Sequence, residues 1–231
     1  MDLSKIHAAI KRIIKKHNEA FKVIGGSQPK LLELASITGF AEHYKSHGFF
    51  VRVHNPKGKA YFAMKAGTHG DPWNFSHFSA NDGIENVEIH MNVKVRSAHD
   101  SGTYCVDVGV VRAGAIPRDK PASKWECLPN EDLVTFGESK KLVVYPMLLA
   151  QFIGIVHEIK PGYLSYTSKK ATDHPPPTLI ALGSFSGNSR AIVNAYPARN
   201  IKLTIAQNYD VRLSRVRRSA TSMSPFYGDE V

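Results

Sequence analysis

Three charged residues in the middle of the chain have types and a spacing that suit metal-dependent hydrolysis. Asp107 interrupts the apolar segment 104–111, where an unpaired charge would be expensive to bury. Glu138 and Lys140 follow the apolar segment 133–136 two residues apart, so on a strand both point to one face. Asp107 and Glu138 together would form an oxygen site for Mg²⁺, with Mn²⁺ as a possible substitute. Lys140 beside them could activate water or stabilise charge on a phosphate.

The hydrophobic pattern predicts the elements that position these residues. Segment 87–95 alternates strictly and should form an antiparallel hairpin with segment 104–111. Apolar residues at three- and four-residue steps predict a helix over 146–159. A strand at 178–183, a helix at 188–196 and a strand at 201–206 should follow, joined by right-handed crossovers. The apolar residues that we expect on one face of the first strand are Val87, Ile89, Met91, Val93 and Val95.

Asp107 in an apolar strand, Glu138-Ser139-Lys140 ending the next strand and an apolar helix after it resemble the PD-(D/E)xK nuclease superfamily. This superfamily includes restriction endonucleases and Mrr-like enzymes. The resemblance covers residues 87–206, about half the chain, and Asp107 follows Val106 where the motif is named for proline. It implies an α/β fold with a central mixed sheet flanked by helices. It also implies a Mg²⁺-dependent endonuclease that hydrolyses phosphodiester bonds, in DNA rather than RNA.

The resemblance also bears on accessory residues and assembly. A Gln on the helix after the motif points toward the metal in several branches, which implies a role for Gln151. A helix before the core sheet sometimes supplies another acid, here Glu33 or Glu42. Glu88 would be a further metal ligand if its face of the strand also carries Asp107. Polarity of an exposed strand face explains Glu88 equally well, and a Gln on the flank of the helix with no role explains Gln151 better. Cutting both strands usually takes two sites, so the analogy implies a homodimer, with restriction, phage defence and repair all open as contexts.

The charge balance favours a polyanionic partner. Lys and Arg number 30 against 20 Asp and Glu, a formal net charge of +10, and neutralising phosphates releases counterions. Cys105 and Cys127 have neither a disulfide pattern nor metal-ligand spacing. No apolar run is long enough to span a membrane, so we expect a cytoplasmic protein without a membrane partner. The candidate nucleic-acid-binding residues are Lys94, Arg96, Arg112 and Arg118.

The predicted organisation has three parts. Residues 1–47 form a helical region, residues 48–208 the nuclease-like core, and residues 209–231 a basic tail. Helices are expected at 3–24, with a basic face, and at 31–44. Strands at 49–54 and 59–65 should pair through the turn 55–58, and segment 67–83 should be a loop rich in aromatic and His residues.

Two other classes of function fit the same residues. The chain could be a catalytically inactive nucleic-acid-binding module of this fold, with Asp107 serving a local turn and Lys140 solvated. It could also be an oligomerising scaffold subunit whose N-terminal helix forms the interface. DNA and RNA are not distinguished by the residues themselves, because readout depends on loops whose shape the sequence does not fix.

Overall fold

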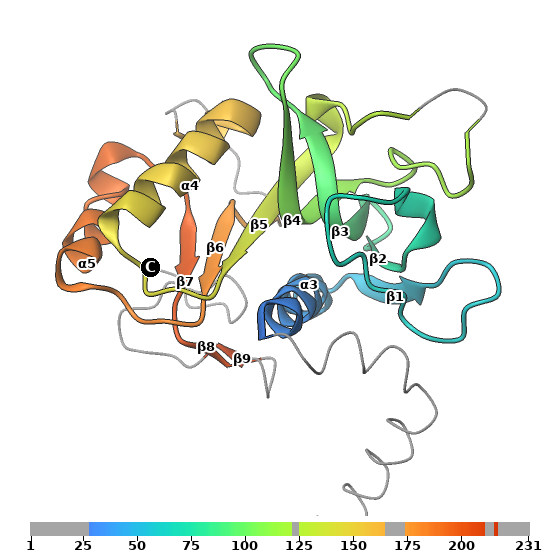
Figure 1. Cartoon of the computed structure of the whole chain (residues 1–231), viewed down its shortest axis with the longest axis horizontal. Coiled ribbons are helices and arrows are strands. Elements are labelled where there is room, and N and C mark those ends of the chain that lie inside the picture. Colours follow the sequence, from blue (N-terminus) through green and yellow to red (C-terminus); the bar gives the residue numbers. More distant parts are fainter. Residues whose placement is uncertain (1–27, 122–124, 165–173, 211–214, 217–231) are drawn as a thin grey trace, which may run out of the picture.

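The computed structural model describes residues 28–121, 125–164, 174–210 and 215–216. A seven-stranded mixed sheet runs in the order β1 to β7, antiparallel from β1 to β5 and parallel from β5 to β7 (Figure 1). This confirms the predicted α/β fold with a central sheet flanked by helices. The elements are α3 (Gln28–Ser46), β1 (Phe50–His54), β2 (His77–Asn81), β3 (Asn86–Arg96), β4 (Thr103–Arg112), β5 (Leu133–Lys140), α4 (Pro146–Ile159), β6 (Thr178–Ala181), α5 (Gly187–Asn194), β7 (Thr204–Ala206) and the two-stranded ribbon β8 (Tyr209–Asp210) and β9 (Arg215–Val216).

Each face of the sheet has its own apolar core. Alternate residues of β6 separate the two, since Leu179 and Ala181 belong to one core and Ile180 to the other. α3 packs on the face of Ile180, and α4 packs on the opposite face with α5 beside it (Figure 1). The buried residues of α4 recur at helical spacing and form one stripe. They are Leu148, Leu149, Phe152, Val156 and Ile159.

α3 begins three residues before the predicted helix because Pro29 is tolerated in a first helical turn. It is followed by Gly48 at φ 89°, a left-handed position that glycine adopts without strain. α3 forms a common core with the sheet. The other predicted elements within residues 48–208, apart from those around β1, agree with the structure to within three residues.

β3 changes faces at Asn92, and the single apolar face that we predicted for segment 87–95 is therefore wrong. Val87, Ile89 and Met91 pack in the core beneath α3, whereas Val93 and Val95 pack in the core beneath α4. Asn92 has φ 51°, a left-handed conformation that asparagine adopts more readily than most residues. One residue in this conformation reverses the side on which the following side chains lie.

β4 makes the same change beside it. Val106 packs in the core beneath α4, and Val108 packs in the core beneath α3. These two residues pair with Val93 and Met91 of β3, so Asp107 lies between them at the level of Asn92. The hairpin therefore changes faces at the position that carries the candidate aspartate.

The predicted pairing of segments 49–54 and 59–65 is also wrong. A turn does form after β1, where the amide of Lys59 donates to the carbonyl of Pro56, but residues 59–65 form no strand. β1 pairs instead with β2, which lies inside the segment predicted as a loop. Phe78 and Ala80 of β2 pack in the core beneath α3, and this burial favours β2 as the partner.

The two ends of the chain carry predicted elements that fall wholly or partly outside the described residues. The helix predicted at 3–24 lies outside the described residues, and of the predicted tail only β8 and β9 and the residues up to 210 are described. Within the described segments, no helix combines the length and the apolar composition needed to cross a bilayer.

Gly137 of β5 is a sensitive contact between the sheet and α3. A Cβ added there would lie 2.7 Å from Cε2 of Phe40, whose side chain is fully buried. We expect Gly137→Ala to lower the free energy of unfolding by about 1–3 kcal/mol, because the core has no room for the methyl group. Urea unfolding followed by circular dichroism measures the change.

Gly154→Ala is the matched control. Gly154 is exposed on α4 and an added Cβ meets nothing within 4 Å, so this variant should gain about 0.5–1 kcal/mol from helix propensity. Equal effects of the two substitutions would show that α3 is not packed against β5 as described.

Candidate active site

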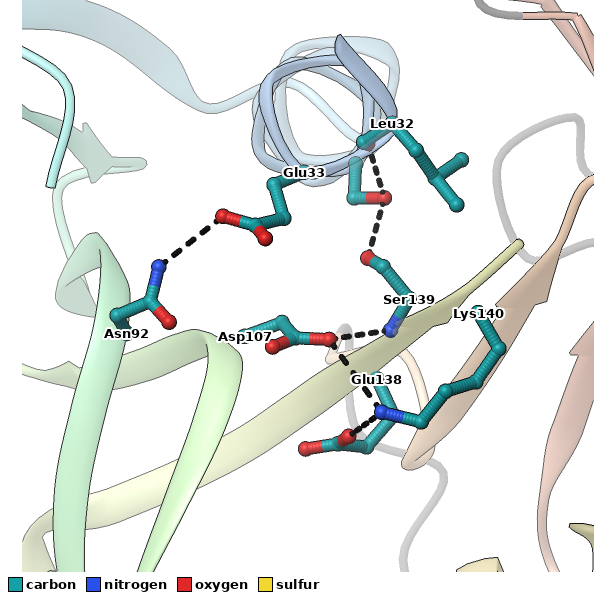
Figure 2. A network of polar contacts seen from close by, with 8 residues as sticks. Leu32, Glu33, Asn92, Asp107, Glu138, Ser139 and Lys140 are labelled. Atoms are coloured by element: carbon teal, nitrogen blue, oxygen red, sulfur yellow. Dashed lines mark hydrogen bonds and ion pairs between the residues drawn. The ribbon is translucent and has the colours of Figure 1, made fainter. Parts of the chain in front are cut away.

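Asp107, Glu138 and Lys140 lie in direct contact, as the sequence predicts (Figure 2). The ammonium of Lys140 donates a hydrogen bond of 2.7 Å to Oε2 of Glu138. The same nitrogen lies 3.8 Å from Oδ2 of Asp107. Glu138 is almost fully buried, and Lys140 and Asp107 are partly exposed. The three side chains form one charged group with access to solvent.

Backbone and side-chain contacts fix the position of this group relative to α3. The amide of Ser139 donates a hydrogen bond of 2.7 Å to Oδ2 of Asp107, which joins β5 to β4. The hydroxyl of Ser139 lies 2.8 Å from the hydroxyl of Ser36 on α3. Ser36 in turn donates to the carbonyl of Leu32 one turn earlier. Two strands and one helix are thus tied together at a single residue, Ser139.

A third carboxylate, Glu33, extends the site from α3. Nδ2 of Asn92 donates hydrogen bonds to Oε2 of Glu33, at 3.2 Å, and to the carbonyl of Lys65, at 2.7 Å. Figure 2 shows Glu33 reaching down from the helix on the side where Asp107 lies. Burial raises the pKa of Glu33; the hydrogen bond from Asn92 opposes this rise, and the negative charge of Asp107 adds to it. The sequence offered Glu33 and Glu42 equally; Glu42 is exposed on α3.

The carboxylates of the site hold their protons more tightly than usual. Burial raises the pKa of Asp107, against the opposing influence of Lys140 and the Ser139 amide. Burial and the negative charge of Asp107 raise the pKa of Glu138 to about 7. Burial alone would lower the pKa of Lys140, but the two carboxylates raise it above its ordinary value. Lys140 is therefore an ammonium at neutral pH.

The residues present suit a hard divalent cation. Oε1 of Glu138 is buried and has no hydrogen-bond partner among the described residues. An unpartnered buried carboxylate oxygen is unfavourable, and a cation between Glu138 and Asp107 would satisfy it. Carboxylate oxygens are the ligands that Mg²⁺ prefers. Asp107 and Glu138 would hold the ion, and Glu33 lies on the adjoining element.

The two accessory candidates lie elsewhere. Glu88 contacts His90 and Arg118 on the part of β3 that precedes Asn92, so the structure does not bring it to Asp107. Glu88 pairs with Val111, four residues along β4 from Asp107, so it lies too far along the hairpin to reach the acidic group. Gln151 is exposed on α4, and within the described residues no hydrogen bond joins it to the site.

The four basic candidates are all exposed but do not form one patch. Lys94 borders a cavity of about 210 Å³ that Asn92 and Trp125 also line. Arg118 forms its ion pair with Glu88 at 3.6 Å. Arg112 lies at the far end of the hairpin, opposite Val87. Lys94 lines the same cavity as Asn92, whose side chain contacts Glu33 of the site. Arg96 lies two residues further along β3.

Cys105, which precedes Asp107 by two residues, is not activated. Burial raises the pKa of its thiol to about 11; Lys65 lowers it, and the carboxylates of Asp107 and Glu138 raise it further. The thiolate that nucleophilic chemistry needs is therefore scarce at neutral pH. Any chemistry at this position would therefore depend on the carboxylates and the lysine.

No protein-family model, curated protein or solved structure matches this chain.

The raised pKa of Glu138 predicts a pH-dependent stability. Because the folded-state pKa is about 7 against an ordinary 4.5, the contribution of Glu138 to stability is complete below about pH 4.5. It is lost as the pH rises through about 7. Glu138→Gln removes this loss. We expect the variant to be about 3 kcal/mol more stable than wild type at pH 8 and no more stable at pH 4.5.

Urea unfolding at the two pH values without added metal measures this difference, with Glu42→Gln on exposed α3 surface as the control. A variant that is less stable than wild type at pH 8 would contradict the conclusion that ionisation of Glu138 destabilises the folded protein.

Proposed function

We propose that this protein is a Mg²⁺-dependent nuclease that hydrolyses phosphodiester bonds, with DNA as the substrate. The observation that carries the proposal is the contact of Lys140 with two carboxylates, one of which has an unpartnered buried oxygen. This combination suits metal-dependent hydrolysis of a phosphodiester, because it can hold a divalent cation and present a positive side chain next to it. The resemblance to PD-(D/E)xK nucleases implies the same residues in the same roles.

The side chains of the site have separable roles in this proposal. When bound, the ion would act as a Lewis acid on the scissile phosphate and lower the pKa of a coordinated water. Lys140 is an ammonium at neutral pH, so it donates hydrogen bonds to a phosphate oxygen and does not accept a proton. This favours charge stabilisation over water activation, the two roles that the sequence left open for Lys140. Asn92 holds Glu33 beside the site.

The surroundings of the site support a nucleic-acid substrate. The cavity of about 210 Å³ next to Asn92 is lined by Lys65, Lys94, His69 and Trp125. Cations hold phosphates, and an aromatic ring can stack on an unpaired base. Lys65 donates to the carbonyls of Gly67 and Asn92, so it also braces the reversal in β3. The net charge of +10 adds a general attraction to polyanions.

Supercoiled plasmid incubated with purified protein in Mg²⁺, Mn²⁺ or EDTA tests the proposal. We expect metal-dependent nicking or linearisation that falls at least about 100-fold in Asp107→Asn, Glu138→Gln and Lys140→Ala, since each removes an electrostatic contact to the reacting groups. Gel electrophoresis over a time course gives the rates.

Two carboxylates of α3 supply a matched pair of controls in the same assay. Glu33→Gln should lower the rate by about 10–100-fold as a residue that adjoins the ligands, whereas exposed Glu42→Gln should leave it unchanged. Failure of every metal to support cleavage of plasmid or RNA, with plasmid retained equally by wild type and the variants, would overturn the proposal in favour of an inactive binding module.

A further inference from the structure

A second group of metal-binding side chains lies on β2 and β3, away from the acidic site. His77, Glu88 and His90 each offer one ligand atom, and these atoms all lie within 4.8 Å of one another. His77 lies opposite His90 in the antiparallel register that pairs Phe78 with Ile89. Glu88 precedes His90 by two residues and so points to the same face of β3. The spacing of the group is thus fixed by two hydrogen-bonded strands.

The three side chains are largely buried, and not all of their polar atoms have a hydrogen-bond partner among the described residues. Glu88 is 1% exposed and His90 is 4% exposed. Nε2 of His90 lies 3.2 Å from Oε2 of Glu88, and the two His rings stack with centroids 4.4 Å apart. Nε2 of His77 is buried and has no hydrogen-bond partner among the described residues. A buried imidazole nitrogen without a partner is unfavourable unless it binds a ligand.

Neighbouring residues orient the ligands and leave one side open. Arg118 lies 3.6 Å from Oε1 of Glu88, which positions that carboxylate. His54 stacks on the outer face of His77 at 5.0 Å, while its own Nε2 lies 2.8 Å from the hydroxyl of Ser79. His77 and His90 also line a cavity of about 130 Å³. A water molecule there could complete a fourth position.

We propose that His77, Glu88 and His90 bind a zinc ion that links β2 to β3. Two imidazoles and one carboxylate form a donor set that zinc accepts, with water in the fourth position. Tetrahedral zinc ligands lie about 3.4 Å apart, so rotations of the rings and the carboxylate must draw the donors together. This centre is distinct from the acidic site, whose ligands are oxygens that prefer Mg²⁺.

The test is metal analysis of the full-length protein. Protein treated with EDTA is dialysed against Zn²⁺, freed of excess ion, and assayed by atomic emission together with thermal unfolding. We expect about one zinc per chain and a higher unfolding temperature than in the stripped protein, because the ion binds only the folded arrangement. Glu88→Gln and His77→Asn should each lower the zinc content at least about tenfold.

Control variants distinguish a failure of the zinc site from a failure of the proposed nuclease activity. His157→Asn, on the exposed surface of α4, and Asp107→Asn should retain zinc at the wild-type level, and circular dichroism verifies that every variant is folded. His77→Asn changes the least buried of the three ligands, so its folding should be least affected. Wild-type protein that retains no zinc, or folded ligand variants that retain it fully, would overturn the zinc site whatever the plasmid assay gives.

Discussion

Mutual repulsion between Asp107 and Glu138 is the constraint around which this part of the molecule is arranged. The two carboxylates share a partly buried position, where each raises the free energy of the other's ionised form. The contact with Lys140 offsets part of that repulsion, and the amide of Ser139 offsets another part at Asp107. Oε1 of Glu138 is left without a partner in the described chain. A divalent cation between the two carboxylates would offset their repulsion and would also give Oε1 of Glu138 a partner.

The acidic site lies at the level of the β3–β4 hairpin where side chains change from one face of the sheet to the other. Asn92 adopts a left-handed conformation, and both strands of the β3–β4 hairpin change from one core to the other at this level. The reversal frees the side chain of Asn92 to hold Glu33 and its carbonyl to accept from Lys65. Such local strain persists because the surrounding contacts determine it, and it is concentrated at functional positions in many proteins.

The sequence was sufficient for what depends on local pattern. Asp107 stood out as a charge in an apolar strand, Glu138 and Lys140 shared a strand face by their spacing, and α4 followed from its apolar stripe. These inferences need only the periods of a strand and a helix. The parallel pairing of β5, β6 and β7 agrees with the predicted alternation of strands and helices in this part of the chain.

What depends on long-range contacts could not be predicted in this way. No local signal distinguished Glu33 from Glu42, since the choice depends on which side of α3 faces the sheet. The reversal at Asn92 breaks an alternation that the sequence presents as unbroken. β2 was hidden in a loop-like segment because its burial comes from α3, which precedes it by about thirty residues. The zinc candidate was missed for the same reason, since His77 was assigned to that loop.

Anomalous diffraction from crystals grown at pH 8 and soaked in Mn²⁺, a substitute for Mg²⁺, would test the central claim most directly. At this pH Glu138, with its pKa of about 7, is ionised. The account predicts an anomalous peak at bonding distance from carboxylate oxygens of both Asp107 and Glu138, with Lys140 displaced from Glu138. Absence of a peak there, with Lys140 still bonded to Glu138, would contradict it, as would a peak confined to His77, Glu88 and His90.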